Sequence, residues 1–282
     1  MKKKGIFVVV LLFFLTVAVV YLGYSYSNKQ QEELIHATST AAVTEETNNN
    51  EETSEVVDPS TYEEKRDQLS VLEYLKYIGT QNEETAIAFY GQLPEEESWT
   101  ENTVNDIEST LANEVKTSVL TKAETDSYDL YITNAAQGLV ETNAAVVFFM
   151  MPALGDQVRD ISLGDSADYL KRNVTAIKEV LPDTLVILVS PAPNSSGIDD
   201  YNSRMLDYVG YMENGIEEAT ENNWPLFDIH TAYMEKLEAE STELTATLQE
   251  DGYLLNSQGE TMVAELFMDQ LTKPIDTTSG LQ

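Results

Sequence analysis

Short apolar runs alternate with helix-like patterns along most of this chain. Two runs, Ala144–Met151 and Leu185–Val189, are apolar without a break, as expected for strands whose two faces are both covered. Shorter runs predict three further strands, at Ala86–Tyr90, Ser118–Leu120 and Leu226–Ile229. Apolar residues at helical spacing predict helices at Tyr62–Ile78, Val104–Val115, Tyr128–Gln137, Ser166–Val180, Asp200–Glu221 and Ser257–Leu271. Because strands alternate with helices, we expect one domain over residues 61–272, an α/β fold with three layers (α/β/α) and a central parallel sheet.

The first 26 residues predict a membrane anchor. Lys2–Lys4 precede the apolar run Ile6–Tyr24, which as a helix would be about 28 Å long, close to the hydrocarbon thickness of a bilayer. The run is longer than the apolar part of a secretory signal and does not end in a small-x-small cleavage motif. We therefore interpret residues 1–26 as an uncleaved transmembrane helix, with the N-terminus in the cytoplasm and the body outside. A cleaved signal peptide is the alternative, and it places the body on the same side.

Charge is distributed unevenly along the chain. The sequence carries 49 acidic and 16 basic residues, a net charge of −33, and no cysteine. Residues 27–60 are acidic, have few large apolar side chains and predict a disordered linker, and residues 273–282 predict a flexible tail. So acidic a chain repels phosphate backbones, which excludes nucleic acid as a partner. The absence of cysteine excludes disulfides, zinc–thiolate sites and a cysteine nucleophile.

The candidate chemistry lies in loops at the carboxyl ends of the predicted strands, where ligand sites of open parallel sheets form. The segment Glu250–Gly259, which leads into the last helix, resembles the final motif of the SGNH (GDSL-type) hydrolases, Asp-Gly-x-His-Pro-Asn-x-x-Gly. Four residues match this motif in register: Asp251, Gly252, Asn256 and Gly259. Gly91, after the first strand, resembles the glycine of the family's Gly-Asp-Ser motif, and residues 146–156 and 181–193 resemble its middle part.

This resemblance implies an SGNH/flavodoxin-like fold and an ester hydrolase with a serine, a histidine and an aspartate at its centre. The chain departs from that pattern at most of the catalytic positions. The residues after Gly91 are Gln92-Leu93-Pro94, none of which has a hydroxyl, and the family histidine falls on Leu254. The oxyanion-hole asparagine falls near Ala153–Gly155, where there is no asparagine. Asp251 is the retained acid, although it also fits a cap of the turn before the last helix.

Ser166 and His230 keep an alternative open. A literal Gly164-Asp165-Ser166 occurs, but it opens a helical pattern instead of following an apolar strand, so Asp165 or Ser166 is better interpreted as an N-cap. His230 is the only histidine between residues 61 and 272 and follows a predicted strand. It would be the general base if Ser166 were a relocated nucleophile. The simpler interpretation is a packed or surface histidine at the start of the next helix.

The sequence therefore favours a membrane-anchored domain on the outer side of the cell membrane, with a degenerate hydrolase centre. Such a domain would bind a cell-wall glycan or an envelope protein. The expected binding residues are Gly91, Gln92, Gly155, Asp156 and Asn256. No cofactor and no metal are expected, because the chain has neither a metal-ligand spacing nor a glycine-rich phosphate loop. The alternatives are an active SGNH-type esterase for carbohydrate or lipid esters with a relocated nucleophile, and a plain structural spacer.

Overall fold

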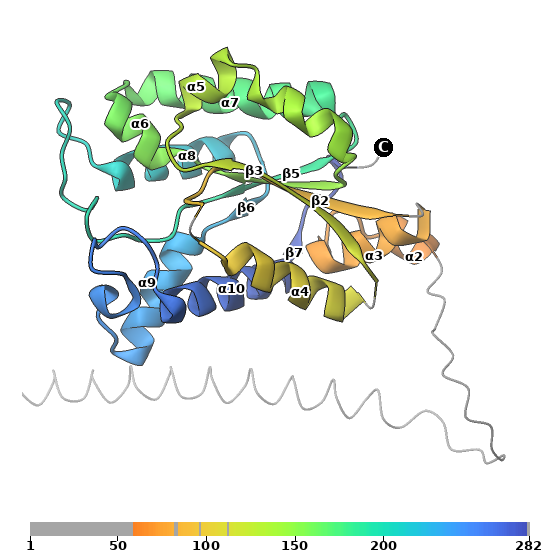
Figure 1. Cartoon of the computed structure of the whole chain (residues 1–282). Helices are drawn as coiled ribbons and strands as arrows, with labels where there is room; N and C mark the ends of the chain where they lie inside the picture. The colour runs from red at the N-terminus through yellow and green to blue at the C-terminus, as the bar shows by residue number, and fades with distance from the viewer. Residues whose placement is uncertain (1–58, 82–83, 96, 112, 281–282) are drawn as a thin grey trace, which may run out of the picture. The chain divides into compact units, whose positions relative to one another are not determined.

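A computed structural model describes residues 59–81, 84–95, 97–111 and 113–280, drawn in colour in Figure 1. The predicted membrane anchor, residues 1–26, and the predicted linker as far as residue 58 lie outside the described residues. None of the helices in the described part combines the length and the apolar character that a membrane crossing requires.

Five parallel strands form the central sheet in the order β3-β2-β4-β5-β6. Their bounds are Thr85–Gln92 for β2, Val115–Lys122 for β3, Val146–Met150 for β4, Leu185–Val189 for β5 and Leu226–Phe227 for β6. The strand predictions are confirmed, and the two unbroken apolar runs are the completely buried strands β4 and β5. The chain order reverses between β2 and β4, and ligand sites of such sheets form at the carboxyl ends of the strands beside this point.

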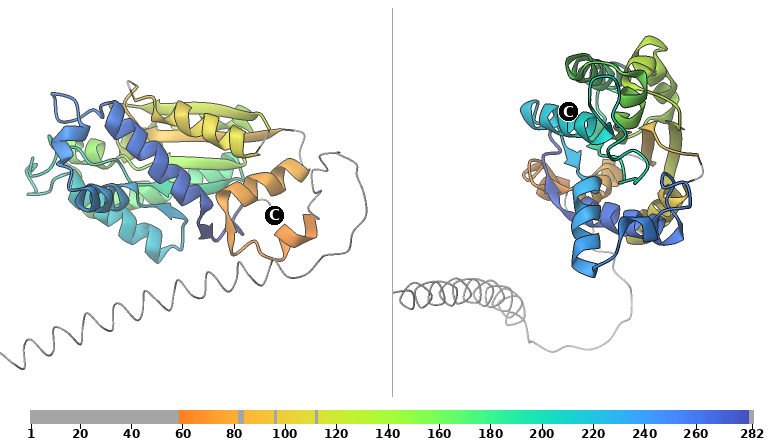
Figure 2. Two further views of the ribbon diagram at one scale, coloured as in Figure 1. Left: turned by 90° about the horizontal axis from the view of Figure 1, so that it is seen from below. Right: turned by 90° about the vertical axis from the view of Figure 1, so that its left-hand side faces the viewer.

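Helices cover both faces of the sheet, as Figure 1 and the end-on view in Figure 2 show, so the predicted three-layer α/β/α fold is confirmed. One face carries α3 (Val71–Gln81), α4 (Trp99–Leu111), α9 (Ile229–Glu240) and α10 (Ser257–Thr272). The other carries α5 (Ser127–Ile132), the 3₁₀ helix η1 (Ala135–Thr142), α6 (Ala153–Arg159), α7 (Leu163–Val180) and α8 (Tyr208–Glu221). A second short 3₁₀ helix, η2 (Leu244–Thr247), follows α9.

Aromatic rings hold α10 against the sheet. The ring centroid of Phe267 in α10 lies 4.9 Å from that of Phe148 in β4 and 5.3 Å from those of Trp99 and Phe227. Such pairs add about 0.5–1.5 kcal/mol each to the stabilisation from buried area. They fix the axis of α10, and with it the loop over residues 249–256 that carries the retained family motif.

The helix predicted over Tyr62–Ile78 is wrong as one element. It is divided into α2 (Pro59–Glu63) and α3, with the short strand β1 (Leu69–Ser70) before α3. The cause is a capping box: Ser70 N–H donates to Glu73 Oε2 at 2.8 Å, and Glu73 N–H donates to Ser70 Oγ at 3.2 Å. These reciprocal bonds start a new helix inside a continuous apolar pattern.

The prediction of a helix over Asp200–Glu221 is also too long, because α8 begins only at Tyr208. Asp207 is its N-cap and accepts a hydrogen bond from Gly210 N–H at 3.1 Å. Residues before the cap form a loop in which the Asn202 amide donates to the Tyr211 hydroxyl at 2.9 Å and to a carbonyl of α6 at 3.2 Å.

The prediction of a flexible tail over residues 273–282 is wrong for residues 273–280. Strand β7 (Pro274–Ile275) pairs antiparallel with β1, and Thr277 is completely buried. Arg66 donates to the carbonyls of Thr277 and Gly280 at 3.2 and 3.0 Å. A guanidinium that satisfies backbone carbonyls in this way holds a polar segment that has little apolar surface to bury. Residues 281–282 lie outside the described residues.

Candidate functional site

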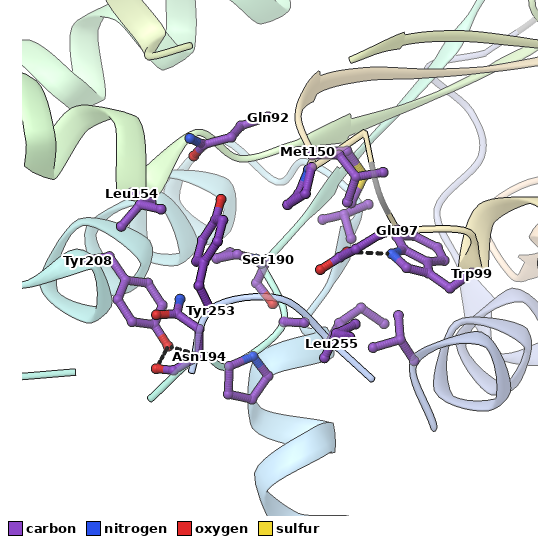
Figure 3. A pocket seen from close by; sticks show the side chains of 18 residues that line it. Gln92, Glu97, Trp99, Met150, Leu154, Ser190, Asn194, Tyr208, Tyr253 and Leu255 are labelled. Atoms are coloured by element: carbon purple, nitrogen blue, oxygen red, sulfur yellow. Dashed lines mark hydrogen bonds between the residues drawn. The ribbon is translucent and has the colours of Figure 1, made fainter. Parts of the chain in front are cut away.

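Two adjacent hollows lie at the carboxyl ends of the strands. One is a narrow, largely apolar cavity of about 50 Å³ beneath the loops that follow β2 and β5. The other is an open groove of about 870 Å³ between the loop after β3, helix α6 and the loop before α10. Four residues line both hollows: Gln92, Pro94, Leu154 and Tyr253. Figure 3 shows the cavity and places the Tyr253 ring between Leu154 and Ser190.

At position 91, where the family motif begins, the backbone conformation requires a glycine. Its φ of +113° is rarely adopted by residues with a side chain, and a Cβ there would lie 2.2 Å from the carbonyl oxygen of Met150. The residue two positions after it, where the family has its serine, is Leu93, and this side chain is buried in the apolar core with 7% of its surface exposed. The nucleophile position is therefore part of the packing.

Gln92 ties the neighbouring loops together. Its amide nitrogen donates to the carbonyl of Ala123 at 3.0 Å, and its amide oxygen accepts from the backbone N–H of Gly155 at 3.2 Å. A catalytic oxyanion hole needs backbone or amide donors that are free to meet a developing negative charge. The Gly155 N–H, beside the place where the family has its oxyanion amide, is already bonded to the chain's own glutamine.

Gly155 also cannot carry a side chain. A Cβ there would lie 1.8 Å from the carbonyl oxygen of Thr125 and 2.9 Å from Cα of Asp126. Both are backbone atoms, so no rotamer change relieves the overlap. The loop after β3 therefore occupies the space that an asparagine side chain at this position would need.

Asp251, the retained family acid, caps the turn in which it lies. Its Oδ1 accepts hydrogen bonds from the backbone N–H groups of Tyr253 at 2.9 Å and Leu254 at 3.1 Å. The side chain that it would orient in an active centre is Leu254, which has no nitrogen. The turn-cap interpretation of Asp251 thus accounts for all its hydrogen bonds in the described part of the chain.

Asn256 begins the last helix. Its Oδ1 accepts from Gln258 N–H at 2.9 Å and Gly259 N–H at 3.1 Å, which is the pattern of an N-cap. Its amide nitrogen donates to the carbonyls of Ala246 and Leu248, at 2.9 and 3.0 Å. All these partners are backbone groups, and Asn256 does not line either hollow.

Asp156 is buried, with 3% of its surface exposed, and joins three helices. Its Oδ1 accepts from the N–H of Ser127 in α5 at 2.7 Å, and its Oδ2 accepts from the hydroxyl of Ser166 in α7. Burial raises the pKa of Asp156 to about 6, although both hydrogen bonds oppose this rise. Ser166 is thus a packing partner of Asp156. The predicted N-cap at Asp165 or Ser166 is wrong, because Ser162 Oγ accepts from the Asp165 N–H at 3.0 Å and begins α7.

His230 lies in the first turn of α9. Its ring Nε2 is 3.3 Å from the hydroxyl of Tyr208, and its backbone N–H donates to Ser190 Oγ at 2.9 Å. Burial lowers the pKa of His230 and raises that of the Tyr208 phenol to about 12. In the described part of the chain, the hydrogen-bond partner of the His230 ring is this weakly acidic phenol, whereas the hydroxyl of Ser166 donates to Asp156. The structure does not bring Ser166 and His230 together in a hydrogen bond.

Sequence reasoning missed three residues that line the cavity, Asn194, Tyr208 and Tyr253. Tyr253 follows the matched Asp-Gly pair, so its place in the motif could have indicated it. Asn194 and Tyr208 belong to the segment after β5, where no pattern marks them. Within the described residues, no group of three or more histidine, aspartate or glutamate side chains is arranged to hold a metal ion.

No protein-family model and no curated protein matches this chain, but solved structures do. A protein named as a GDSL-like lipase from Parabacteroides merdae has a TM-score of 0.51 and 12% identity, over 67% of this chain and 95% of that one. A carbohydrate esterase family 3 protein from Talaromyces cellulolyticus has a TM-score of 0.52 and 16% identity, over 66% and 96%. An acetylxylan esterase from Geobacillus stearothermophilus has a TM-score of 0.51 and 15% identity, over 66% and 94%. At these identities the likeness concerns the fold, and the chain therefore has the fold of the SGNH (GDSL-type) hydrolases.

Proposed function

We propose that this protein is a non-hydrolytic binding protein of the cell envelope, held at the outer face of the membrane by residues 1–26. Its SGNH-fold domain binds a glycan in the open groove at the strand ends, and through it serves as an accessory to the modification or organisation of the envelope. The observation that carries the proposal is the packing of Gln92, Leu93 and Gly155 at the positions where the family performs chemistry.

Ester hydrolysis by this family's chemistry needs a nucleophile, a base within hydrogen-bond reach of it, and donors for the oxyanion. Leu93 and Leu254 supply neither of the first two groups. The donor near the third position, the Gly155 N–H, is bonded to Gln92. Loss of all three together supports binding without turnover better than it supports a slow enzyme.

The groove suits an uncharged, hydroxyl-rich ligand. Arg159, which lines it, is held by the carboxylates of Asp126 and Asp129, so its charge is compensated within the protein. Glu124 adds a further carboxylate at the rim, and Tyr253 offers an aromatic ring. Carboxylates accept hydrogen bonds from sugar hydroxyls, and amides both accept and donate them, whereas a polyanionic polymer is repelled by this acidic domain. Two of the similar structures are named as esterases of carbohydrates, which agrees with a glycan ligand.

An active esterase with Ser166 as nucleophile and His230 as base is the alternative. The contacts of both residues weigh against it, since the Ser166 hydroxyl donates to the buried Asp156 and the His230 ring lies beside the Tyr208 phenol. A fluorophosphonate probe, which labels activated serines, tests it directly. Labelling of the purified protein that is lost in Ser166→Ala and in His230→Ala would establish the alternative.

The proposal is tested by hydrolysis assays with the purified full-length chain, using p-nitrophenyl acetate and an O-acetylated xylo-oligosaccharide. We expect rates equal to those in buffer, for the native chain and for Asp251→Ala alike. Asp168→Ala, a change at an exposed position of α7, is the matched control. Turnover above buffer that is retained in the control but lost in Asp251→Ala would overturn the proposal, because it would show that the family acid still orients a working base.

A further inference from the structure

Strand β3 forms an open edge of the central sheet. It pairs with β2 over its whole length, and no described strand pairs with its other side. The carbonyl of Lys122 accepts from the N–H of Leu93 at 3.2 Å and therefore points toward β2. Backbone groups alternate between the two sides of a strand. The residues whose backbone groups point away from β2 are therefore Val115, Thr117, Val119 and Thr121.

Most of these outward backbone groups have no partner in the described part of the chain. Val115 is the exception, because its N–H donates to Glu108 Oε1 at 3.0 Å and its carbonyl accepts from the Thr117 hydroxyl at 3.3 Å. The N–H and C=O groups of Thr117, Val119 and Thr121 make no hydrogen bond with a described residue. Such a row of donors and acceptors is a template to which an extended segment adds as another strand.

The side of this edge that faces α4 suits apolar side chains. Thr117 and Val119 line a lateral hollow of about 460 Å³ together with Val104 of α4, and the Val119 side chain is 57% exposed. Glu101 and Glu108 also line the lateral hollow, and their carboxylates repel an acidic group. Residues of an added strand that point to this side should therefore be apolar and uncharged.

The opposite side of the edge presents two cations. Side chains alternate along a strand, so Lys116 and Lys122 point to the same side as Leu120, which packs toward η1. Both lysines are exposed, and neither forms an ion pair with a described carboxylate. In a chain with 49 acidic and 16 basic residues, β3 contains these two lysines and no acidic residue. Residues of an added strand that point to this side should therefore be acidic.

We propose that the β3 edge binds an extended acidic segment of a partner protein, which adds to the sheet as a further strand. Its backbone pairs with residues 117–121, its acidic side chains lie beside Lys116 and Lys122, and its apolar side chains enter the lateral hollow beside Val119. The two lysines are six positions apart, about 20 Å along a strand, so the acidic residues that match them have the same spacing. This surface is separate from the groove, so it does not depend on the proposed glycan.

A second copy of this chain fits the edge less well. Antiparallel pairing of two β3 strands about Val119 would place Lys116 of each copy opposite Lys122 of the other. Like charges directly opposite one another destabilise a strand pair. Lysines on an edge strand also serve in many proteins to discourage any pairing. Here they lie near the two ends of β3 and leave the stretch between them uncharged.

The experiment is a fluorescence anisotropy titration of two labelled peptides with the full-length chain, at about 0.15 M salt, where distant charges are screened. The first peptide is Gly-Glu-Val-Thr-Val-Thr-Val-Glu-Gly, whose two glutamates are spaced like the lysines of β3. The second has lysine in place of both glutamates. Each sequence reads the same in both directions, so it tests parallel and antiparallel addition alike. We expect the glutamate peptide to bind about ten-fold more tightly.

Variants of β3 test the charges and the backbone separately. Lys116→Gln combined with Lys122→Gln should remove the preference for the glutamate peptide. Lys171→Gln combined with Lys236→Gln is the matched control, because these lysines are paired with carboxylates of α8 and α10, and it should leave the preference unchanged. Val119→Pro removes an outward N–H and no hydrogen bond to β2, so it should weaken both peptides about ten-fold. Circular dichroism checks that this variant is folded.

Amide hydrogen exchange measured by NMR reads out strand addition directly. The glutamate peptide should slow exchange at Thr117, Val119 and Thr121 and leave Ser118 and Leu120, which face β2, unchanged. Equal affinity for the two peptides, an unchanged preference in the Lys116 and Lys122 double variant, or no slowing at the outward amides would overturn the proposal. So would binding of neither peptide, which would mean that the lysines only protect the edge. A dimer in light scattering that is lost in Val119→Pro would place a second copy there and also overturn it.

Discussion

Replacing the Asp156 carboxyl by an amide tests whether this residue is a buried charge that the fold tolerates at a cost. The carboxyl group belongs to a residue that is 3% exposed and accepts two hydrogen bonds, from α5 and α7. Burial raises its pKa from the ordinary 3.8 to about 6. Such a difference between the unfolded and the folded state corresponds to about 3 kcal/mol of unfolding free energy.

The sign follows from where the proton is bound. Below pH 4 the Asp156 carboxyl is protonated in both states and has no effect. Between pH 4 and pH 6 the folded state holds the proton more tightly than the unfolded state, so this group makes the protein less stable as the pH rises. Above pH 6 the carboxyl is ionised in both states and the full cost remains. The amide in Asp156→Asn cannot ionise, so the variant escapes this cost.

The assay is urea unfolding of native chain and Asp156→Asn from pH 4 to pH 8, followed by tryptophan fluorescence. The stability of the variant relative to the native chain should rise by up to about 3 kcal/mol between pH 4 and pH 7. Repulsion within the acidic domain is nearly the same in both proteins and cancels in the difference. Asp168→Asn, at an exposed position of α7, should show no such trend. A difference that is constant with pH, or that falls, would refute the account of Asp156 as a desolvated carboxylate.

Three further changes test the packing at the strand ends and the closing segment. Gly155→Ala should lower the unfolding free energy by more than about 2 kcal/mol, because its Cβ would overlap the backbone of Thr125; thermal unfolding measures this. Arg66→Ala should cost about 1–3 kcal/mol and speed amide hydrogen exchange in residues 274–280, because its side chain binds the carbonyls of Thr277 and Gly280. The double variant with Leu93→Ser and Leu254→His should not be labelled by a fluorophosphonate probe, because the oxyanion donors remain absent or occupied. Labelling of this variant would contradict the account.

The sheet was predictable from the sequence because its central strands are covered on both faces and so are apolar throughout. The ends of the helices could not be predicted, because single side-chain hydrogen bonds determine where they lie. Glu73 starts a helix within the apolar pattern of residues 62–78, and Asp207 delays the start of α8. The segment at residues 273–280 has no apolar signal of its own, and its place depends on Arg66, more than 200 residues earlier.

For the site, the motif match located the loops that meet there and the positions that lack the family's catalytic side chains. It could not show which contacts leave no room for catalytic groups at those positions. The bond from Gly155 to Gln92 and the contact of Gly155 with the loop after β3 join segments about 30 to 60 residues apart. The hydrogen bond from the Gly197 N–H to Asn194 Oδ1 is likewise one that no spacing rule marks. Such features depend on backbone approach in three dimensions and leave no periodic signal in the sequence.

The claim that this SGNH-fold domain binds without hydrolysing is tested most directly by acetate release. Proton NMR follows free acetate while the purified full-length chain, at high concentration, is incubated with O-acetylated xylo-oligosaccharide. The account predicts acetate at the rate of the buffer control, and the same rate for Asp251→Ala. Release above buffer that depends on Asp251 would contradict it.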